Sequence, residues 1–361
     1  MEAARPTEET GNPPRALVRL GAVALAVGTG VALWLLPGPV QPEGEAKQQP
    51  RAPSATPSAA RQRPASGPAM PRYRAFLRVS DGPVPDPSGT ARTAGVRWFV
   101  LGHLIAGPDG CTARWAGVPS ARAGAVTGRV AGIAARLRAD GRHAWPVFGG
   151  PGGPELSAAC PDQERLTAAY RQVIDALRPT GIDFEINDPS DPAASRRRSA
   201  AIALLQREAR DRGRPLRVTF TLPATERGLA QTDLAMLRTA RASGVTIDGV
   251  DLLVPLRPGG LIRLLTAARS AHRQLAAVLG VTGRALWRRM GLTPVLDSPA
   301  DLGPLQARRL AVFRARTGLG WLSTGGARPG DETVRVLAGP GPARDDQGES
   351  VATVGGTTRV P

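Results

Sequence analysis

The segment 181–187, Gly-Ile-Asp-Phe-Glu-Ile-Asn, constrains the fold of this chain more than any other stretch. Its polar and apolar residues alternate, which predicts a short buried β-strand, because successive side chains of a strand point to opposite faces. Polar groups then occupy one face and large apolar groups the other: Asp183, Glu185 and Asn187 against Ile182, Phe184 and Ile186. Burying carboxyl groups in a row is costly, so the polar face is expected to line a site.

The region 72–326 alternates strand-like and helix-like segments. Eight strands with intervening helices over this length predict an α/β fold, the (β/α)8 or TIM barrel. A doubly wound sheet is the competing fold, but no Gly-x-Gly-x-x-Gly turn follows the first strand. The expected strands are 73–79, 96–105, 143–148, 182–186, 216–222, 249–255, 290–295 and 320–323. Helical patterns occur at 162–177, 232–243 and 261–279.

The acidic strand also carries a resemblance to a known family. The row Asp183-x-Glu185-x-Asn187 resembles the Asp-x-Asp-x-Glu catalytic strand of family 18 glycoside hydrolases, the chitinases. The segment 148–150, Phe-Gly-Gly, is similar to a strand end of that family. Other segments resemble a bacterial subgroup of chitinase-like proteins, at 110–115, 155–160, 219–223 and 287–294. The resemblance covers most of the region 72–326, and it implies a TIM barrel related to enzymes that cleave N-acetylglucosamine-containing glycans.

The positions that carry catalysis in that family differ here. The family uses substrate-assisted retention: the substrate's own N-acetyl oxygen attacks, and a glutamic acid protonates the leaving oxygen. Asn187 stands at the glutamic acid position, and a carboxamide cannot supply that proton. Glu185 replaces the middle aspartate. In the sixth strand Leu256 and Arg257 replace an Asp-Tyr pair, and Gly325 stands where the family has the tryptophan floor of the sugar site. With these changes the resemblance implies a barrel that has lost the family's chemistry.

Two functions follow from these residues. In the first, the protein is catalytically inactive and binds a glycan or a protein partner at the barrel mouth, the end at which the strands finish. In the second, it is an active glycoside hydrolase on an N-acetylglucosamine-containing or other glycan, and it uses a relocated carboxylate. Asp188 is the candidate relocated acid, next to Asn187. Glu185 is expected roughly 6.6 Å deeper along the strand, as a structural carboxylate beside Asp183 or an arginine.

The candidate ligand-binding residues are Gly149, Gly150, Trp115 and Arg257. Trp115 could stack on a sugar, and packing is its alternative role. No spacing of His, Asp and Glu resembles a metal site, so neither a metal nor a cofactor is expected. The net charge is +17, but the basic residues are scattered arginines apart from Lys47, without interleaved aromatics. A nucleic-acid partner is therefore not expected.

The N-terminal region predicts a membrane anchor. Residues 20–36 carry no charge and follow Arg15 and Arg19; their number is at the short end of the roughly 17–25 residues that span a bilayer. No clear cleavage site follows, so we expect a single-pass anchor with the barrel outside the cell, and a secreted protein is the alternative. The expected divisions are a cytoplasmic N-terminus at 1–19, the anchor at 20–36, a Pro-rich disordered linker at 37–71, the barrel at 72–326 and a loose tail at 327–361.

The chain has two cysteines, Cys111 and Cys160. An even number in an exported domain predicts a disulfide bridge, with two buried free thiols as the alternative. Each cysteine follows an expected strand, so the bridge would join two loops on the same face of the barrel.

Overall fold

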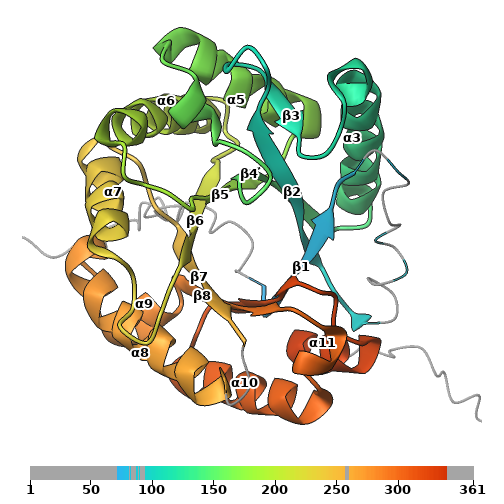
Figure 1. Cartoon of the computed structure of the whole chain (residues 1–361), viewed down its shortest axis with the longest axis vertical. Helices are drawn as coiled ribbons and strands as arrows, with labels where there is room; N and C mark the ends of the chain where they lie inside the picture. Colours follow the sequence, from blue (N-terminus) through green and yellow to red (C-terminus); the bar gives the residue numbers. More distant parts are fainter. Residues whose placement is uncertain are drawn as a thin grey trace, which may run out of the picture. The chain divides into compact units, whose positions relative to one another are not determined.

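Eight parallel strands close into a barrel in the computed structural model, which describes residues 71–80, 82, 87, 89, 94–256 and 260–339 (Figure 1). The barrel strands are β1 (Tyr73–Arg78), β2 (Trp98–Ala106), β4 (His143–Gly149), β5 (Gly181–Glu185), β6 (Arg217–Pro223), β7 (Gly249–Pro255), β8 (Met290–Leu296) and β9 (Trp321–Ser323). Neighbours in this order pair in parallel, and β1 closes the ring by pairing with both β2 and β9. A short β3 (Ala113–Trp115) runs antiparallel to β2, and β10 (Gly325–Gly326) pairs with β8.

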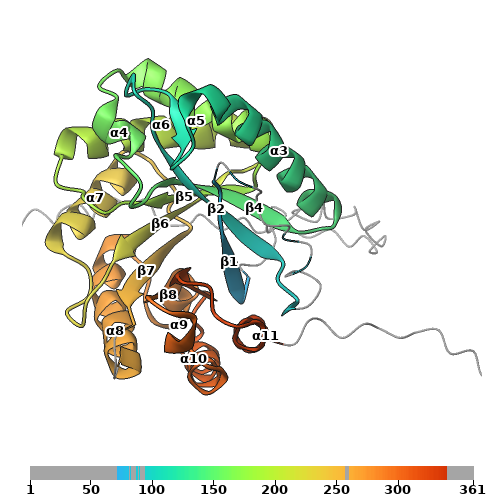
Figure 2. The same ribbon diagram turned by 45° about the vertical axis from the view of Figure 1, so that its right-hand side comes forward.

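Helices lie outside the ring and alternate with its strands. They are α3 (Ala123–Ala139), α4 (Leu156–Ala159), α5 (Gln163–Leu177), α6 (Pro192–Asp211), α7 (Gln231–Ala242), α8 (Gly260–Leu279), α9 (Gly283–Trp287), α10 (Pro304–Thr317) and α11 (Asp331–Ala338), with 3-10 turns at Ser120–Arg122 and Pro299–Asp301. Figure 2 shows α3, α5 and α6 side by side over the part of the barrel that contains β2, β4 and β5. This arrangement is the predicted TIM barrel.

The outward face of the strands is apolar and packs against these helices. Phe148, Phe184 and Phe220 form one row across β4, β5 and β6, with ring centroids 5.4 and 5.7 Å apart. Tyr170 of α5 packs edge-on against the first two rings. All four side chains are fully buried, and burying such a side chain contributes about 1.5–3 kcal/mol to stability. The alternation in the acidic strand therefore sends its apolar residues outward and leaves Asp183 and Glu185 inside the barrel.

All eight expected strands are present, and none of their ends differs from the predicted one by more than two residues. The prediction of a loose tail is wrong over its first part, because residues 331–338 form α11. Thr333, Val334 and Leu337 of that helix are buried, and it packs against α10, β1 and β9. Its amphipathic stripe extends over only eight residues in a Gly- and Pro-rich stretch, which is too short for a helical period to be recognised.

The predicted disulfide is confirmed: Cys111 and Cys160 are bonded, with their Cα atoms 4.7 Å apart. It joins the turn between β2 and β3 to the end of α4. None of the helices in the described part of the chain is both long and apolar enough to cross a membrane. The predicted anchor at 20–36 lies outside the described residues, as does the predicted linker at 37–71 apart from its last residue.

Candidate functional site

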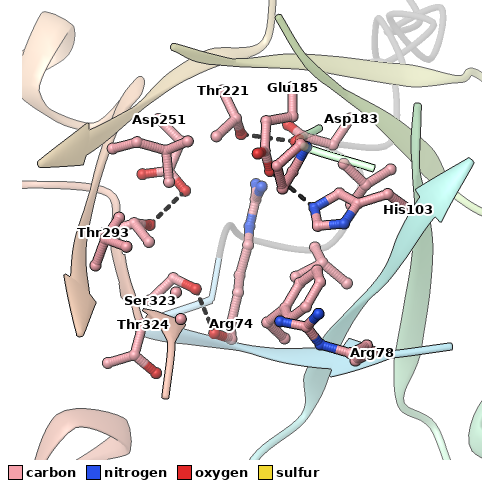
Figure 3. A pocket seen from close by; sticks show the side chains of 18 residues that line it. Arg74, Arg78, His103, Asp183, Glu185, Thr221, Asp251, Thr293, Ser323 and Thr324 are labelled. Carbon is pink, nitrogen blue, oxygen red and sulfur yellow. Dashed lines mark hydrogen bonds and ion pairs between the residues drawn. The ribbon is translucent and has the colours of Figure 1, made fainter. Parts of the chain in front are cut away.

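A cavity of about 210 Å³ opens at the end of the barrel where the strands finish (Figure 3). We call it the central cavity. The residues that line it are Arg74, Phe76, Arg78, Val100, His103, Val147, Pro151, Asp183, Glu185, Thr221, Asp251, Leu253, Thr293, Val295, Ser323, Thr324, Gly325 and Gly326. They come from all eight barrel strands or the residues just after them. Active sites of TIM barrels lie at this end, so the cavity is the first candidate for a ligand site.

The floor of the central cavity is a buried arginine between two tryptophans. Arg74 is 2% exposed, and its guanidinium carbon lies 4.7 Å from the ring centroid of Trp145 and 3.9 Å from that of Trp321. Both rings fit because glycines face them: a Cβ at Gly181 would lie 2.5 Å from Trp145, and one at Gly291 would lie 2.1 Å from Trp321. Stacking on two indole faces attracts the cation, and burial lowers the Arg74 pKa to about 10.

Two carboxyl groups flank this arginine. Asp183 accepts hydrogen bonds from the hydroxyls of Thr219 and Thr221, the second at 2.6 Å. Asp251 Oδ2 accepts from Thr293 at 2.9 Å and from Trp321 Nε1 at 3.1 Å. Burial raises the pKa of Asp183 to about 7 and also raises that of Asp251, and the nearby Arg74 opposes both shifts. The floor is therefore a buried polar network that holds its carboxyls in place, in which Asp251 Oδ1 accepts no hydrogen bond from the described residues.

At the mouth, Glu185 pairs with a histidine. Glu185 is the last residue of β5, and its Oε2 lies 3.0 Å from His103 Nε2. Both side chains are 13% exposed and face the central cavity. The His103 ring packs against Phe76 on one side, with centroids 4.9 Å apart. Figure 3 shows the pair above Arg74, with Arg78 turned toward the same opening from β1. Glu185 is thus a carboxyl group at the cavity, where sequence reasoning placed it deeper in the barrel.

Asn187 and Asp188 do not face the central cavity. β5 ends at Glu185, where Gly150 N still donates to Glu185 O at 2.9 Å, and Ile186 N donates to Thr221 O at 3.1 Å. The chain then turns, because Asp188 Oδ1 accepts from Ser190 N at 2.9 Å around Pro189. Asn187 and Asp188 are exposed and line a neighbouring cavity of about 260 Å³. The expected alternation therefore holds for Asp183 and Glu185 and stops before Asn187.

Comparisons with known proteins agree with the barrel fold. No family model matches the chain. Over 184 residues, 50% of this chain, it is 24% identical to a probable bifunctional chitinase/lysozyme of Escherichia coli (strain K12), and the match covers 20% of that protein. The catalytic domain of a hyperthermophilic chitinase from Pyrococcus furiosus has the same fold, with a TM-score of 0.63 at 22% identity over 75% of this chain and 95% of that chain.

A fungal endo-β-N-acetylglucosaminidase of glycosyl hydrolase family 18 shares the fold as well, with a TM-score of 0.53 at 12% identity over 74% of this chain and 97% of that chain. The chain is thus similar in sequence to chitinases and has the barrel fold of that family. It spans about a fifth of the length of the Escherichia coli relative.

In this chitinase-like barrel, several residues predicted to touch a ligand have other roles. Trp115 is 1% exposed and donates from Nε1 to Thr127 at 3.2 Å, so of its two possible roles packing is confirmed and stacking on a sugar is wrong. Gly149 and Gly150 adopt positive φ angles of 90° and 85°. A Cβ at Gly149 would lie 2.2 Å from Glu185 O, and one at Gly150 would lie 2.3 Å from the His103 ring. The two glycines therefore position the Glu185–His103 pair.

The remaining predicted positions divide between the cavity wall and the core of the chitinase-like barrel. Gly325 lines the central cavity, and Trp321, four residues earlier in the sequence, is fully buried and stacks on Arg74. Leu256 is 8% exposed and belongs to the hydrophobic core. Arg257 lies outside the described residues.

Sequence reasoning missed the partners of these acids. Arg74, Asp251 and His103 all face the central cavity, and none was identified as a site residue. One signal was available for Arg74: an arginine alternates with Phe76 and Arg78 in an otherwise apolar first strand. In a barrel, the inward-facing side chains of all strands point toward one axis. Those of the first strand must therefore meet the inward-facing acids of the other strands.

Proposed function

We propose that this chitinase-like barrel binds an N-acetylglucosamine-containing glycan at its mouth and does not hydrolyse it by the family's mechanism. One observation carries the proposal: the barrel keeps a formed cavity at the catalytic end, whereas the residue at the proton-donor position, Asn187, is an amide outside that cavity. Loss of a general acid removes roughly 10²–10⁴ in rate, and the acetamide-orienting residues of the family are replaced as well.

The wall of the central cavity suits a sugar with an acyl substituent. Phe76, Val147, Leu253 and Val295 contribute apolar surface from four different strands, and the other lining residues add carboxyl, hydroxyl and guanidinium groups. Ligand sites of this mixed kind orient a ligand through a few polar groups and bind it through apolar contact. The hydroxyls of a sugar match the polar groups, and the methyl group of an N-acetyl substituent matches the apolar side chains.

We also propose that the barrel lies outside the membrane and is held there by an uncleaved anchor at residues 20–36. The disulfide between Cys111 and Cys160 supports an oxidising compartment, since such bonds persist mainly in exported proteins. A secreted form is the alternative. Protease treatment of intact cells should digest the barrel, and a mature N-terminus beyond residue 36 would contradict the anchor.

Binding is tested with the full chain, purified in a non-glycosidic detergent so that no sugar headgroup competes. Isothermal titration with the N-acetylglucosamine tetramer should give saturable binding. Val295→Trp places an indole in the central cavity and should weaken that binding at least tenfold, because the wall residue faces the ligand. Val312→Trp is the matched control, since Val312 is 49% exposed on α10. Absence of tetramer binding in the unmodified chain would refute a glycan ligand and leave a protein partner.

A second candidate is an active glycoside hydrolase that uses Glu185 as the acid. The observation that favours it is the position of the Glu185 carboxyl in the central cavity, 3.0 Å from His103. Asp188, the candidate predicted from the sequence, lines the neighbouring cavity and caps Ser190. Hydrogen bonds from Ser190 hold the Asp188 pKa below its ordinary value, so this carboxyl is ionised and is a poor proton donor.

A further inference from the structure

Two large apolar side chains project outward from one helix of the ring, α10. Among the described residues four such side chains are exposed, and α10 carries two of them, Leu305 (61% exposed) and Val312 (49% exposed). Seven residues, or roughly two helical turns, separate them, so they lie nearly in line on one side of the helix. Single exposed apolar side chains are ordinary, whereas two on one stripe of one helix indicate a surface that contacts a partner.

The same side of α10 is positively charged. Arg309 and Arg316 follow Leu305 by four and eleven residues and so share its stripe, and Arg308 flanks it. All three arginines are exposed, and none of their side chains forms an ion pair or a hydrogen bond within the part of the chain that the structure describes. α10 contains no acidic residue, so this charge is available to an anionic partner. We call Leu305, Arg308, Arg309, Val312 and Arg316 the α10 surface.

Two neighbouring helices extend the positive charge around the α10 surface. Figure 1 shows α10 on the outside of the ring, with α8 and α9 to one side of it and α11 to the other. Arg269 of α8 lies over Phe313 of α10, with its guanidinium carbon 5.4 Å from the ring centroid. Arg284 of α9 borders the end of α10, since a Cβ at Gly318 would lie 2.9 Å from its Nε. Both arginines are exposed, so the basic region continues from α10 onto α8 and α9.

Exposed cations beside large apolar side chains match the surface of an anionic bilayer. Arginines attract acidic headgroups, and their aliphatic stems enter the boundary between headgroups and acyl chains together with leucine and valine side chains. A nucleic acid would use the cations alone and would leave the two apolar side chains in water. α11 adds no net negative charge beside α10, because its acids Asp331 and Glu332 are balanced by Arg328, 3.0 Å from Asp331, and by Arg335.

We propose that the α10 surface docks the barrel onto an anionic lipid bilayer. The helices of a TIM barrel run alongside its strands, so this contact lays the barrel on its side and leaves the mouth open along the membrane. The inference goes beyond the proposed glycan ligand and the proposed anchor at residues 20–36. The anchor would hold the chain at a membrane, and the α10 surface decides which side of the barrel faces that membrane.

The test places a fluorescent label beside the α10 surface in the full chain, reconstituted in vesicles whose lipids carry nitroxide quenchers. Ala315→Cys supplies the attachment site, at an exposed position three residues after Val312. Ala135→Cys is the matched control, at an exposed alanine of α3; that helix also contains arginines and no acid, but it has no exposed large apolar side chain. Cys111 and Cys160 are bonded to each other, so the label reacts with the new cysteine. Quenching then reports contact with the bilayer.

In vesicles of phosphatidylcholine and phosphatidylglycerol, the label at position 315 should be quenched at least threefold more than the label at position 135. The difference should disappear in vesicles of phosphatidylcholine alone and at high salt, because both remove the attraction between charges. It should also disappear in the double variant Leu305→Asn, Val312→Ser and in the triple variant Arg308→Gln, Arg309→Gln, Arg316→Gln. Equal quenching of the two labels in the anionic vesicles would overturn the proposal.

Two other outcomes would also overturn it and would identify a different occupant. Contact that is lost in the arginine variant but kept in the apolar variant would indicate a surface for any polyanion, including a nucleic acid. A blue shift of the label at position 315 that grows with protein concentration in detergent, without lipid, would indicate a second copy of the chain. Failure of the glycan or anchor proposals would not affect these results, because the two labels are compared in the same reconstituted chain.

Discussion

The floor of the central cavity is buried and closely packed, whereas its mouth is partly exposed and rests on fewer contacts. Arg74, Asp183 and Asp251 at the floor are each 6% exposed or less, and each interacts with groups on other strands. At the mouth, Glu185 has His103 as a partner, and Asn187 lies in solvent. The polar interior of the barrel can thus persist while the groups that perform the family's chemistry change, because the two sets have few contacts in common.

The largest effect is expected from removing the cation at the floor. Arg74→Met keeps much of the volume but leaves Asp183 and Asp251 without their shared countercharge and removes the stacking on Trp145 and Trp321. Breaking a buried charge cluster in this way costs about 3–5 kcal/mol. Denaturant unfolding followed by circular dichroism measures the loss. Arg78→Met is the control on the same strand and the same face; it is exposed and should change stability by about 0.5 kcal/mol or less.

If the two variants lose similar stability, the contrast between floor and mouth is mistaken. A loss at Arg78 alone would place the structural role at the mouth.

The second-largest effect on stability is expected from removing the disulfide, because it joins loops beside the mouth. The bridge between Cys111 and Cys160 closes a loop with a sequence separation of 49 residues. Chain-entropy arguments give a contribution of about 4 kcal/mol for a loop of this length, as an upper value. The double variant Cys111→Ala, Cys160→Ala should therefore unfold at lower denaturant concentration without a change in the position of the floor residues. Unchanged stability after reduction of the unmodified protein would argue against a bracing role.

The pH dependence of stability offers a third test of the floor. The folded-state pKa of Asp183 is about 7, above its ordinary value of 3.8, so between these values the folded state binds a proton that the unfolded state has released. Its stabilising contribution is complete below about pH 4 and is lost as the pH rises through 7, with a slope of about 1.4 kcal/mol per pH unit in between. Unfolding free energies of the unmodified protein and of Asp183→Asn at pH 5, 6 and 7 should therefore converge or cross, because the variant lacks this slope.

Asp188→Asn is the matched control, since Asp188 is exposed and caps a turn at the surface. Its pH profile between 5 and 7 should parallel that of the unmodified protein. Parallel profiles for Asp183→Asn as well would mean that Asp183 ionises normally in the folded barrel.

The smallest effect on stability is expected at the Glu185–His103 pair, where the effect on ligand affinity should be larger. Glu185→Gln keeps the size of the side chain and removes its charge, and His103→Gln removes the ring that packs on Phe76. Each should weaken binding of the N-acetylglucosamine tetramer about tenfold, measured by titration calorimetry, with little change in unfolding midpoint. Unchanged affinity in both would exclude the pair from the binding site.

The sequence was sufficient to predict the fold and to predict which side chains share a face in one strand, β5. The alternation of strand-like and helix-like segments located all eight strands, and the alternation of polar and apolar residues at 181–187 predicted that Asp183 and Glu185 share a face, which points inward. It did not predict where β5 ends, because the last hydrogen bonds of that strand, from Gly150 N to Glu185 O and from Ile186 N to Thr221 O, depend on neighbouring strands. The partners Arg74, His103 and Asp251 come from three other strands. Their contacts arise only when the barrel closes, so no local pattern contains them.

Product analysis tests the central claim most directly. The full chain is incubated with the N-acetylglucosamine pentamer at a concentration that saturates binding, and the mixture is analysed by chromatography with mass detection. We predict that the pentamer stays intact, as in buffer, because no proton donor occupies the family's position at the bound sugar. Shorter oligomers well above the buffer level, produced by the unmodified chain and by Asn187→Ala but not by Glu185→Gln, would contradict the claim and identify Glu185 as a working acid.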